Sequence, residues 1–186
     1  MDNNYSAQKI IDLINSAKNG DQTAFTEIYQ SFYAPLYRYI YSKTRDSGNT
    51  EDILQEVFLK IYKSIMAGSL HNGHVSPLAY FYTVARNLII DESRKKRTLF
   101  FKDCHQIENI KDNNLGINEA LAQKQDSELV LAVINKLEEG QQEVIQLRYS
   151  SEMSYREISQ IIGKSEEAVR QINVRAINNL RNIMIK

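Results

Sequence analysis

One stretch near the C-terminus carries, at helical spacing, side chains suited to hydrogen bonding with nucleic-acid bases. The stretch after Ser165 contains Arg170, Gln171, Val174 and Arg175. A guanidinium matches the edge of guanine, a glutamine amide matches adenine, and a valine can contact the methyl group of thymine. This combination favours a helix that reads base edges in the major groove of DNA.

The elements that must position these side chains form a short helical hairpin, "SYREISQIIGKSEEAVRQINVRAINNLR". Gly163 can take the left-handed conformation of a sharp turn, and Ser165 can cap the second helix. The inward positions are Ile158, Ile161 and Ile162 on the first helix and Val169, Ile172, Ala176 and Leu180 on the second. In a helix-turn-helix the first half of the second helix, from Glu167 to Arg175, faces DNA. A plain amphipathic hairpin that closes a core explains the same pattern, and both interpretations remain open at this point.

A second group of polar residues lies in the first half of the chain, along the second half of a helix expected over residues 76–97 and beside a loop expected over residues 66–76. Its members are Arg86, Asn87, Arg94, Lys95, Lys96 and Arg97. Basic grooves hold single strands, and polar pockets hold extruded bases. A basic helix end that complements the helix dipole is the plainer interpretation.

A third group lies on the helix expected over residues 51–65. Its apolar positions are Ile53, Leu54, Val57, Phe58 and Ile61. The polar positions left on the other face are Asp52, Gln55, Glu56 and Lys60. On the pattern alone, this face is a solvated surface.

Residue types that signal an enzyme or a cofactor site are not grouped in this sequence. The pair His71 and His74 and the pair Cys104 and His105 do not supply four metal ligands at a recognised spacing. No phosphate-binding glycine loop and no nucleophile motif occurs. We therefore expect no enzyme activity, no cofactor and no metal.

The periodicity and composition predict an all-α chain, with only 7 Gly and 2 Pro in 186 residues. Helices are expected over residues 6–18, from Asp21 to about residue 41, and over 51–65, 76–97, 126–137 and 141–149, followed by the hairpin. Pro35 is expected to kink or split the second of these helices. The segment "DSGNT" is expected to break the helical pattern before the third helix. Glu51 and Asp52 are expected in the first turn of that third helix. The aromatic residues from Phe25 to Tyr41 are expected in the core.

Residues 98–125 carry no apolar period and read as a flexible linker. The predicted organisation is therefore two small helical domains, residues 1–97 and 126–186, joined by that linker, with a helix-turn-helix in the second domain.

The formal charge of zero, from 23 basic and 23 acidic residues, conceals an acidic middle, net −3 over residues 98–128, and a basic C-terminal end, net +3 over residues 154–186. Such asymmetry hints at nucleic acid as a partner. The single cysteine, the absence of a signal-peptide pattern and the absence of a long apolar run predict a cytoplasmic protein that is not inserted in a membrane.

Two separate stretches resemble one family. "LEEGQQEVIQLRYSSEMSYREISQIIGKSEEAVRQINVRAINNLR" resembles the C-terminal domain of bacterial sigma factors. "AFTEIYQSFYAPLYRYI", "EDILQEVFLKIYKSI" and "AYFYTVARNLIIDESRKKR" are similar to their other DNA-facing domain. Both domains in this order, with only a linker between them, resemble the small extracytoplasmic-function (ECF) sigma factors. The family often has Trp at the position of Tyr80 and a basic residue at that of Ile172.

The resemblance implies core RNA polymerase and promoter DNA, both duplex and melted, as partners, and an anti-sigma factor as a further candidate. It implies that core polymerase binds Asp52, Gln55, Glu56 and Lys60. The residues implied at the melted minus-ten element are Tyr80, Arg86, Asn87, Arg94, Lys95 and Arg97. Those implied at the minus-thirty-five duplex are Arg148, Lys164, Glu167, Arg170, Gln171, Val174 and Arg175.

Two other classes of protein remain as alternatives. One is a stand-alone helix-turn-helix regulator, which would bind DNA without polymerase, usually as a dimer. The other is a structural or interaction protein. Promoter-dependent transcription with added core polymerase would separate these alternatives from a sigma factor.

Overall fold

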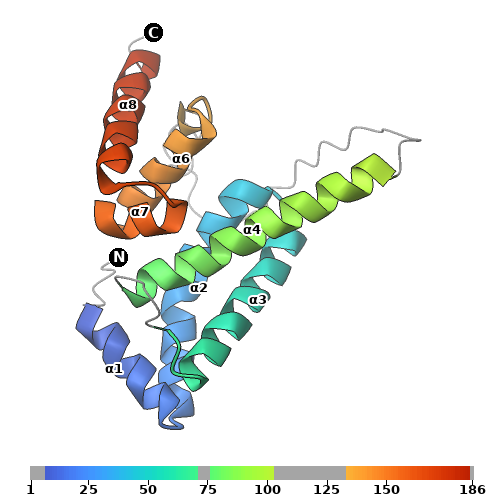
Figure 1. The fold of residues 1–186 in the computed structure, drawn as a ribbon, viewed down its shortest axis with the longest axis vertical. Helices are drawn as coiled ribbons and strands as arrows, with labels where there is room; N and C mark the ends of the chain where they lie inside the picture. The colour runs from blue at the N-terminus through green and yellow to red at the C-terminus, as the bar shows by residue number, and fades with distance from the viewer. Residues whose placement is uncertain (1–6, 71–75, 103–132, 185–186) are drawn as a thin grey trace, which may run out of the picture. The chain divides into compact units, whose positions relative to one another are not determined.

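A computed structural model of the protein describes residues 7–70, 76–102 and 133–184, and the regular structure in these ranges is helical throughout (Figure 1). The prediction of an all-α chain is confirmed. Within these ranges, no helix has an apolar stretch long enough to cross a membrane.

The chain divides into two compact units. The first unit contains four helices, α1 (Ala7–Lys18), α2 (Gln22–Thr44), α3 (Ser47–Met66) and α4 (Pro77–Lys102). The second contains α6 (Glu139–Ile145), a π-helical turn η1 (Gln146–Ser150), most of α7 (Tyr155–Ile162), and α8 (Glu166–Met184). Residues 98–102 of the predicted linker are the end of α4, while its remainder and most of the helix predicted over residues 126–137 lie outside the described residues.

The turn between α1 and α2 is formed by residues whose conformational preferences can be read from the sequence. Gly20 has a left-handed φ of 97°, which glycine adopts without a steric penalty. Asp21 then caps α2, accepting hydrogen bonds from the backbone N–H groups of Thr23 at 2.9 Å and Ala24 at 3.3 Å. The Thr23 hydroxyl also donates to this carboxylate, and this bond, followed by the two backbone bonds, lowers the pKa of Asp21. The predicted start of α2 is confirmed.

Pro35 does not split α2, which runs without interruption from Gln22 to Thr44. The expectation of a split was wrong because proline removes only one backbone donor, whereas Phe32, Leu36 and Tyr39 around it are all buried. Burial of this face holds the helix together across the missing hydrogen bond.

The start of α3 also differs from the sequence-based expectation. Asp46 caps the helix by accepting a hydrogen bond from the Asn49 N–H group at 3.2 Å. The fully buried Thr50 donates its hydroxyl to the Asp46 carbonyl at 2.6 Å. "DSGNT" is therefore a cap and a first helical turn, not an interruption, and Glu51 lies beyond that turn.

The core of the first unit lies between α2, α3 and α4. Ile28, Val57 and Phe81 are fully buried, one from each helix, and the Phe32 and Phe81 rings meet edge to face with centroids 5.2 Å apart. α4 continues to Lys102, beyond the end predicted at residue 97, because no Gly or Pro follows Pro77 within it.

The second unit opens with α6, which begins at Glu139, two residues before the predicted start, and passes directly into η1. α6 packs against α8. Leu147, Met153, Ile158, Val169 and Ala176 are fully buried here. The predicted inward faces of the hairpin are confirmed for Ile158, Ile161, Val169 and Ala176, while Ile162, Ile172 and Leu180 are only half-buried.

The connection between α7 and α8 has the geometry expected of a helix-turn-helix. Gly163 has a left-handed φ of 68°. Ser165 caps α8, with the Ala168 N–H group donating to its hydroxyl at 3.2 Å. Both predictions are confirmed.

The start of α7 is held by a reciprocal pair of hydrogen bonds between Ser154 and Glu157. The Glu157 N–H group donates to the Ser154 hydroxyl at 3.2 Å, and the Ser154 N–H group donates to the Glu157 carboxylate at 2.9 Å. Replacing Ser154 with alanine should lower the free energy of unfolding of this unit by about 1 kcal/mol, because a helix donor loses its acceptor. Urea denaturation followed by circular dichroism measures the change. Ser154→Thr, which keeps the hydroxyl, should remain near wild type; equal losses in both variants would contradict the capping role.

Candidate nucleic-acid interface

The outward face of α8 carries the residues predicted to meet duplex DNA. Glu167, Arg170, Gln171, Val174 and Arg175 are all exposed. The side chain of Val174 is 57% exposed, although it is apolar and its neighbours on this face are charged or carry an amide. Chemically, this face offers guanidinium donors, an amide and a methyl surface, which is what base edges require.

Arg170 is held on two sides before any DNA is present. Its guanidinium forms an ion pair with the Glu166 carboxylate, one helical turn earlier. It also lies over the ring of Tyr155, with the guanidinium carbon 4.6 Å from the ring centroid. The side chain remains about half exposed, so it is oriented but accessible.

Arg148 has a different environment from the other predicted upstream residues. It is half-buried in η1, and its guanidinium donates to the Met153 carbonyl at 2.6 Å. It also lies 4.8 Å from the centroid of the Tyr155 ring. These contacts join η1 to the start of α7. Lys164, by contrast, is exposed in the turn after Gly163.

Sequence reasoning missed Asn173, which is buried to 5% exposure in the middle of α8. Its side-chain amide donates to the Tyr155 hydroxyl at 3.0 Å and reaches the Tyr149 hydroxyl at 3.4 Å. The available signal was its spacing, because Asn173 lies four residues after Val169 and three before Ala176 and therefore shares their inward face. A polar residue at such a position implies buried hydrogen-bonding partners.

The predicted minus-ten residues lie along α4, and three of them share one side of it. Tyr80, Asn87 and Arg94 are spaced by seven residues, two helical turns, and form a row about 21 Å long. Asn87 and Arg94 are exposed, and Tyr80 is half-buried with its hydroxyl bonded to that of Ser64. Residues 71–75, between α3 and α4, lie outside the described residues.

The remaining α4 residues of that set are arranged less uniformly. Arg97 is exposed and Arg86 is half-buried. Lys95 is exposed but lines a cavity of about 280 Å³ between α3 and α4, on a different side from Asn87. The structure therefore does not bring all six predicted residues onto one surface.

The apolar stripe of α3 is confirmed, since Ile53, Leu54, Val57, Phe58 and Ile61 are all buried. The predicted polar face, Asp52, Gln55, Glu56 and Lys60, is exposed throughout.

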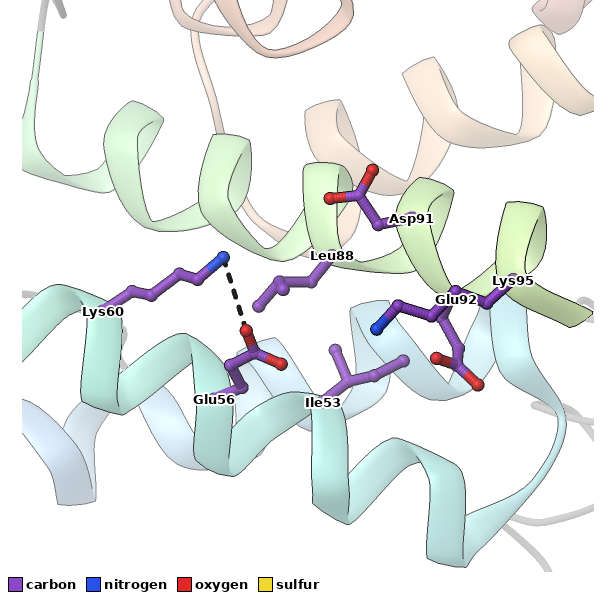
Figure 2. Close-up of a pocket in the computed structure, with 7 residues that line it drawn as sticks. All are labelled: Ile53, Glu56, Lys60, Leu88, Asp91, Glu92 and Lys95. Carbon is purple, nitrogen blue, oxygen red and sulfur yellow. Dashed lines mark ion pairs between the residues drawn. The ribbon is translucent and has the colours of Figure 1, made fainter.

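Glu56 and Lys60 form an ion pair at 3.4 Å on the side of α3 that faces α4. Figure 2 shows this pair beside Leu88 and Ile53, which point into the space between the two helices. Asp91 and Glu92 of α4 line the same cavity.

Gln55 lies on the other side of α3. It lines a groove of about 140 Å³ with Glu51 and the α2 residues Tyr29 and Tyr33. The polar face of α3 therefore opens onto two neighbouring hollows, one shared with α4 and one with α2.

The aromatic residues of α2 divide into two sets, which corrects the expectation that all belong to the core. Phe32 and Tyr39 are buried, but Tyr29 and Tyr33 are 40% and 36% exposed. The outer set, spaced every four residues, is Phe25, Tyr29, Tyr33, Tyr37 and Tyr41.

Neighbouring rings of this outer row are in contact from Tyr29 onward. The centroids of Tyr33 and Tyr37 lie 6.2 Å apart, and those of Tyr37 and Tyr41 lie 6.0 Å apart. Burial, followed by the nearby Glu51 carboxylate, raises the pKa of Tyr37. The buried residues Ile28, Phe32, Leu36 and Ile40 repeat at the same spacing of four residues, so spacing alone did not separate the two sets.

Metal-ligating residues are not gathered in the part of the chain that the structure describes. His71, His74, Cys104 and His105 lie outside that part.

Comparison with known families assigns both units. Residues 28–98 match "Sigma-70 region 2", and residues 133–182 match "Sigma-70, region 4". The two matches contain α3 with most of α2 and α4, and α6 to α8 with the helix-turn-helix.

Relatives share most of the chain. The ECF RNA polymerase sigma factor SigM of Bacillus subtilis is 30% identical over 155 residues, covering 83% of this chain and 91% of SigM. The ECF RNA polymerase sigma factor BldN of Streptomyces coelicolor is 26% identical over 183 residues, covering 95% of this chain and 66% of BldN.

Solved structures share the fold. CnrH, in complex with the cytosolic domain of CnrY, superposes with a TM-score of 0.64 at 20% identity, covering 96% of this chain and 97% of CnrH. The sigma factor RpoE of Bartonella quintana, in complex with the anti-sigma factor NepR, gives 0.60 at 22% identity, covering 85% and 96%. The chain belongs to the extracytoplasmic-function (ECF) group of the sigma-70 family, non-enzymatic factors that direct RNA polymerase to promoters.

Proposed function

We propose that the two units divide promoter recognition between them. The second, residues 126–186, reads the minus-thirty-five duplex through the outward face of α8. The observation that carries this assignment is the exposure of Arg170, Gln171, Val174 and Arg175 on a helix that follows a tight, capped turn. That geometry presents the first half of α8 to a major groove.

The first unit, residues 1–97, binds core polymerase through α3 and captures the melted minus-ten strand along α4. The row formed by the half-buried Tyr80 and the exposed Asn87 and Arg94 supports the second role, because basic grooves with aromatic side chains hold single strands and polar groups hold extruded bases. The exposed polar face of α3 supports the first. The linker predicted over residues 98–125 connects the two units, and its first residues, 98–102, are the end of α4.

The partners in this proposal are core RNA polymerase, promoter DNA and an anti-sigma factor. The last is included because RpoE of Bartonella quintana, which shares this fold, is seen with the anti-sigma factor NepR. The proposal places the protein in the cytoplasm, where bacterial polymerase meets the chromosome.

Transcription in vitro tests the proposal directly. The full chain is mixed with core polymerase and a library of promoter fragments, and run-off transcripts are sequenced. We expect transcripts that start at defined promoters only when the protein is present. A stand-alone regulator would instead bind DNA without core enzyme and produce no such transcripts, which would contradict the proposal.

Replacing Arg170 with alanine should weaken binding of the minus-thirty-five duplex by about 1–3 kcal/mol and relax the preference at one base pair. Arg170→Lys should lose the same preference while keeping part of the affinity, because an ammonium group cannot make the paired bonds of a guanidinium. Binding of holoenzyme to single-base promoter variants measures both effects.

Arg181→Ala is the matched control, since Arg181 is exposed on the last turn of the same helix. It should leave the preference unchanged. If Arg170→Ala weakens binding equally on every promoter variant, Arg170 contacts phosphate and not a base. If it weakens binding on none of them, α8 does not enter the groove.

A further inference from the structure

We propose that Tyr155 is a positioning residue, which fixes the guanidinium of Arg170 in the orientation used to read the promoter. The inference rests on the proposed function, because it takes Arg170 to be a base-reading residue. Tyr155 itself is the first residue of α7 and lies on the other helix of the hairpin. The inference is that its effect on base preference passes through Arg170.

The ring of Tyr155 is shared by two guanidinium groups. Arg170 lies 4.6 Å and Arg148 lies 4.8 Å from the ring centroid. Guanidinium groups at such distances are attracted to the negative face of the ring. Because Arg148 is also tied to the Met153 carbonyl at 2.6 Å, one of the two cations is anchored in the fold and the other projects toward solvent.

The ring is held at its hydroxyl end as well. The buried Asn173 donates its amide to the Tyr155 hydroxyl at 3.0 Å. Asn173 lies three residues after Arg170 on the same helix. α8 therefore fixes the ring from one end, and η1 supplies a cation against it.

The remaining side of Arg170 is occupied by the carboxylate of Glu166. Between Tyr155 and Glu166, a long and otherwise mobile side chain has few orientations left. An arginine ordered before binding spends less conformational entropy when it meets DNA. Removing the Tyr155 ring should therefore weaken recognition although no DNA contact is deleted.

The size of the effect follows from the usual cost of ordering one long side chain at an interface. Tyr155→Leu should weaken binding of the minus-thirty-five duplex by about two- to tenfold. The loss should fall on the base pair that Arg170 reads, so the preference at that position weakens. Tyr155→Phe keeps the ring face and should retain most of the preference.

The test is a double-variant cycle in holoenzyme bound to single-base promoter variants. Tyr155→Leu, Arg170→Ala and their combination are compared with wild type. If Tyr155 acts through Arg170, the combined variant should bind like Arg170→Ala alone. Tyr149→Leu, which changes an exposed tyrosine that also reaches Asn173, is the matched control and should be near wild type.

A second measurement does not depend on DNA. NMR signals of the Arg170 side chain in the full chain should carry a ring-current shift from Tyr155, which Tyr155→Phe keeps and Tyr155→Leu removes. Absence of that shift in wild type would overturn the inference even if Tyr155→Leu failed to fold.

The outcomes separate the inference from the function on which it rests. The positioning role is overturned if the loss of affinity in the combined variant equals the sum of the two single losses. It is also overturned if Tyr155→Leu weakens binding equally on all sequences. In both cases Arg170 can still read a base. No effect of Arg170→Ala on any promoter variant overturns both. Non-additive loss at one base pair, with the ring-current shift present, supports the inference.

Discussion

Replacing Gln55 and Glu56 together with alanine should lower the affinity for core RNA polymerase by about 3–5 kcal/mol, the range of central interface residues. Both side chains are exposed and lie beside the buried stripe of α3, so their removal should not disturb the core. Alanine also favours helix. The thermal stability of the unit should therefore stay near wild type while core binding is lost.

The two replaced side chains line different hollows. Gln55 opens onto the groove shared with Tyr29 and Tyr33, and Glu56 onto the cavity shared with α4. The ion pair of Glu56 with Lys60 is exposed, and such pairs contribute about 0–1 kcal/mol to stability. Comparing the affinities of Gln55→Ala and Glu56→Ala for core polymerase therefore tests which of the two hollows lies at the interface.

Association is measured with labelled protein and core enzyme at equilibrium. The matched control is Gln8→Ala with Asp12→Ala, an exposed glutamine and carboxylate on α1 whose side chains hydrogen-bond at 3.0 Å. That pair should leave core affinity unchanged. Wild-type affinity after the Gln55 and Glu56 changes would show that polymerase docks elsewhere.

Replacing Asn87 with alanine should reduce promoter opening by roughly 100-fold. This factor corresponds to the few kcal/mol of stacking energy that an extruded base loses and that contacts in the pocket must replace. An amide presents donors and an acceptor together, so it can pair with the edge of such a base. Core binding and upstream duplex binding should both persist.

The environment of Asn87 makes this variant informative. Its side chain is exposed on α4, midway between Tyr80 and Arg94 on the same side of the helix. Removing an exposed amide from a helix leaves no cavity and no buried unsatisfied group. A loss of opening would therefore reflect the DNA contact rather than the fold.

Permanganate reactivity of minus-ten thymines reports opening, and a gel shift of holoenzyme on the upstream duplex reports the other contact. Asn15→Ala, which removes an exposed amide from α1, is the control and should open promoters normally. A parallel fall of both signals with Asn87→Ala would indicate a folding role. If neither signal falls, the pocket lies elsewhere on α4, and Tyr80 is the next residue to replace.

Several features of this protein follow from its sequence alone because they depend on neighbours a few residues away. The apolar stripe of α3, from Ile53 to Ile61, repeats at the helical period. Asp21, Gly163 and Ser165 mark turns and caps by their own conformational and hydrogen-bonding preferences. The residues of α8 that face outward follow from the same period.

Other features were decided by contacts between distant segments, which no local pattern contains. α2 continues through Pro35 because the buried residues around it outweigh one missing hydrogen bond. The polar face of α3 borders two hollows because α2 and α4 pack on either side of it.

The clearest case is Tyr155, which the sequence presents as an ordinary residue at a helix start. Its role depends on Arg148, Arg170 and Asn173, which reach it from η1 and α8. Only the tertiary structure brings these side chains within contact, because folding, and not sequence spacing, sets the distance between two helices.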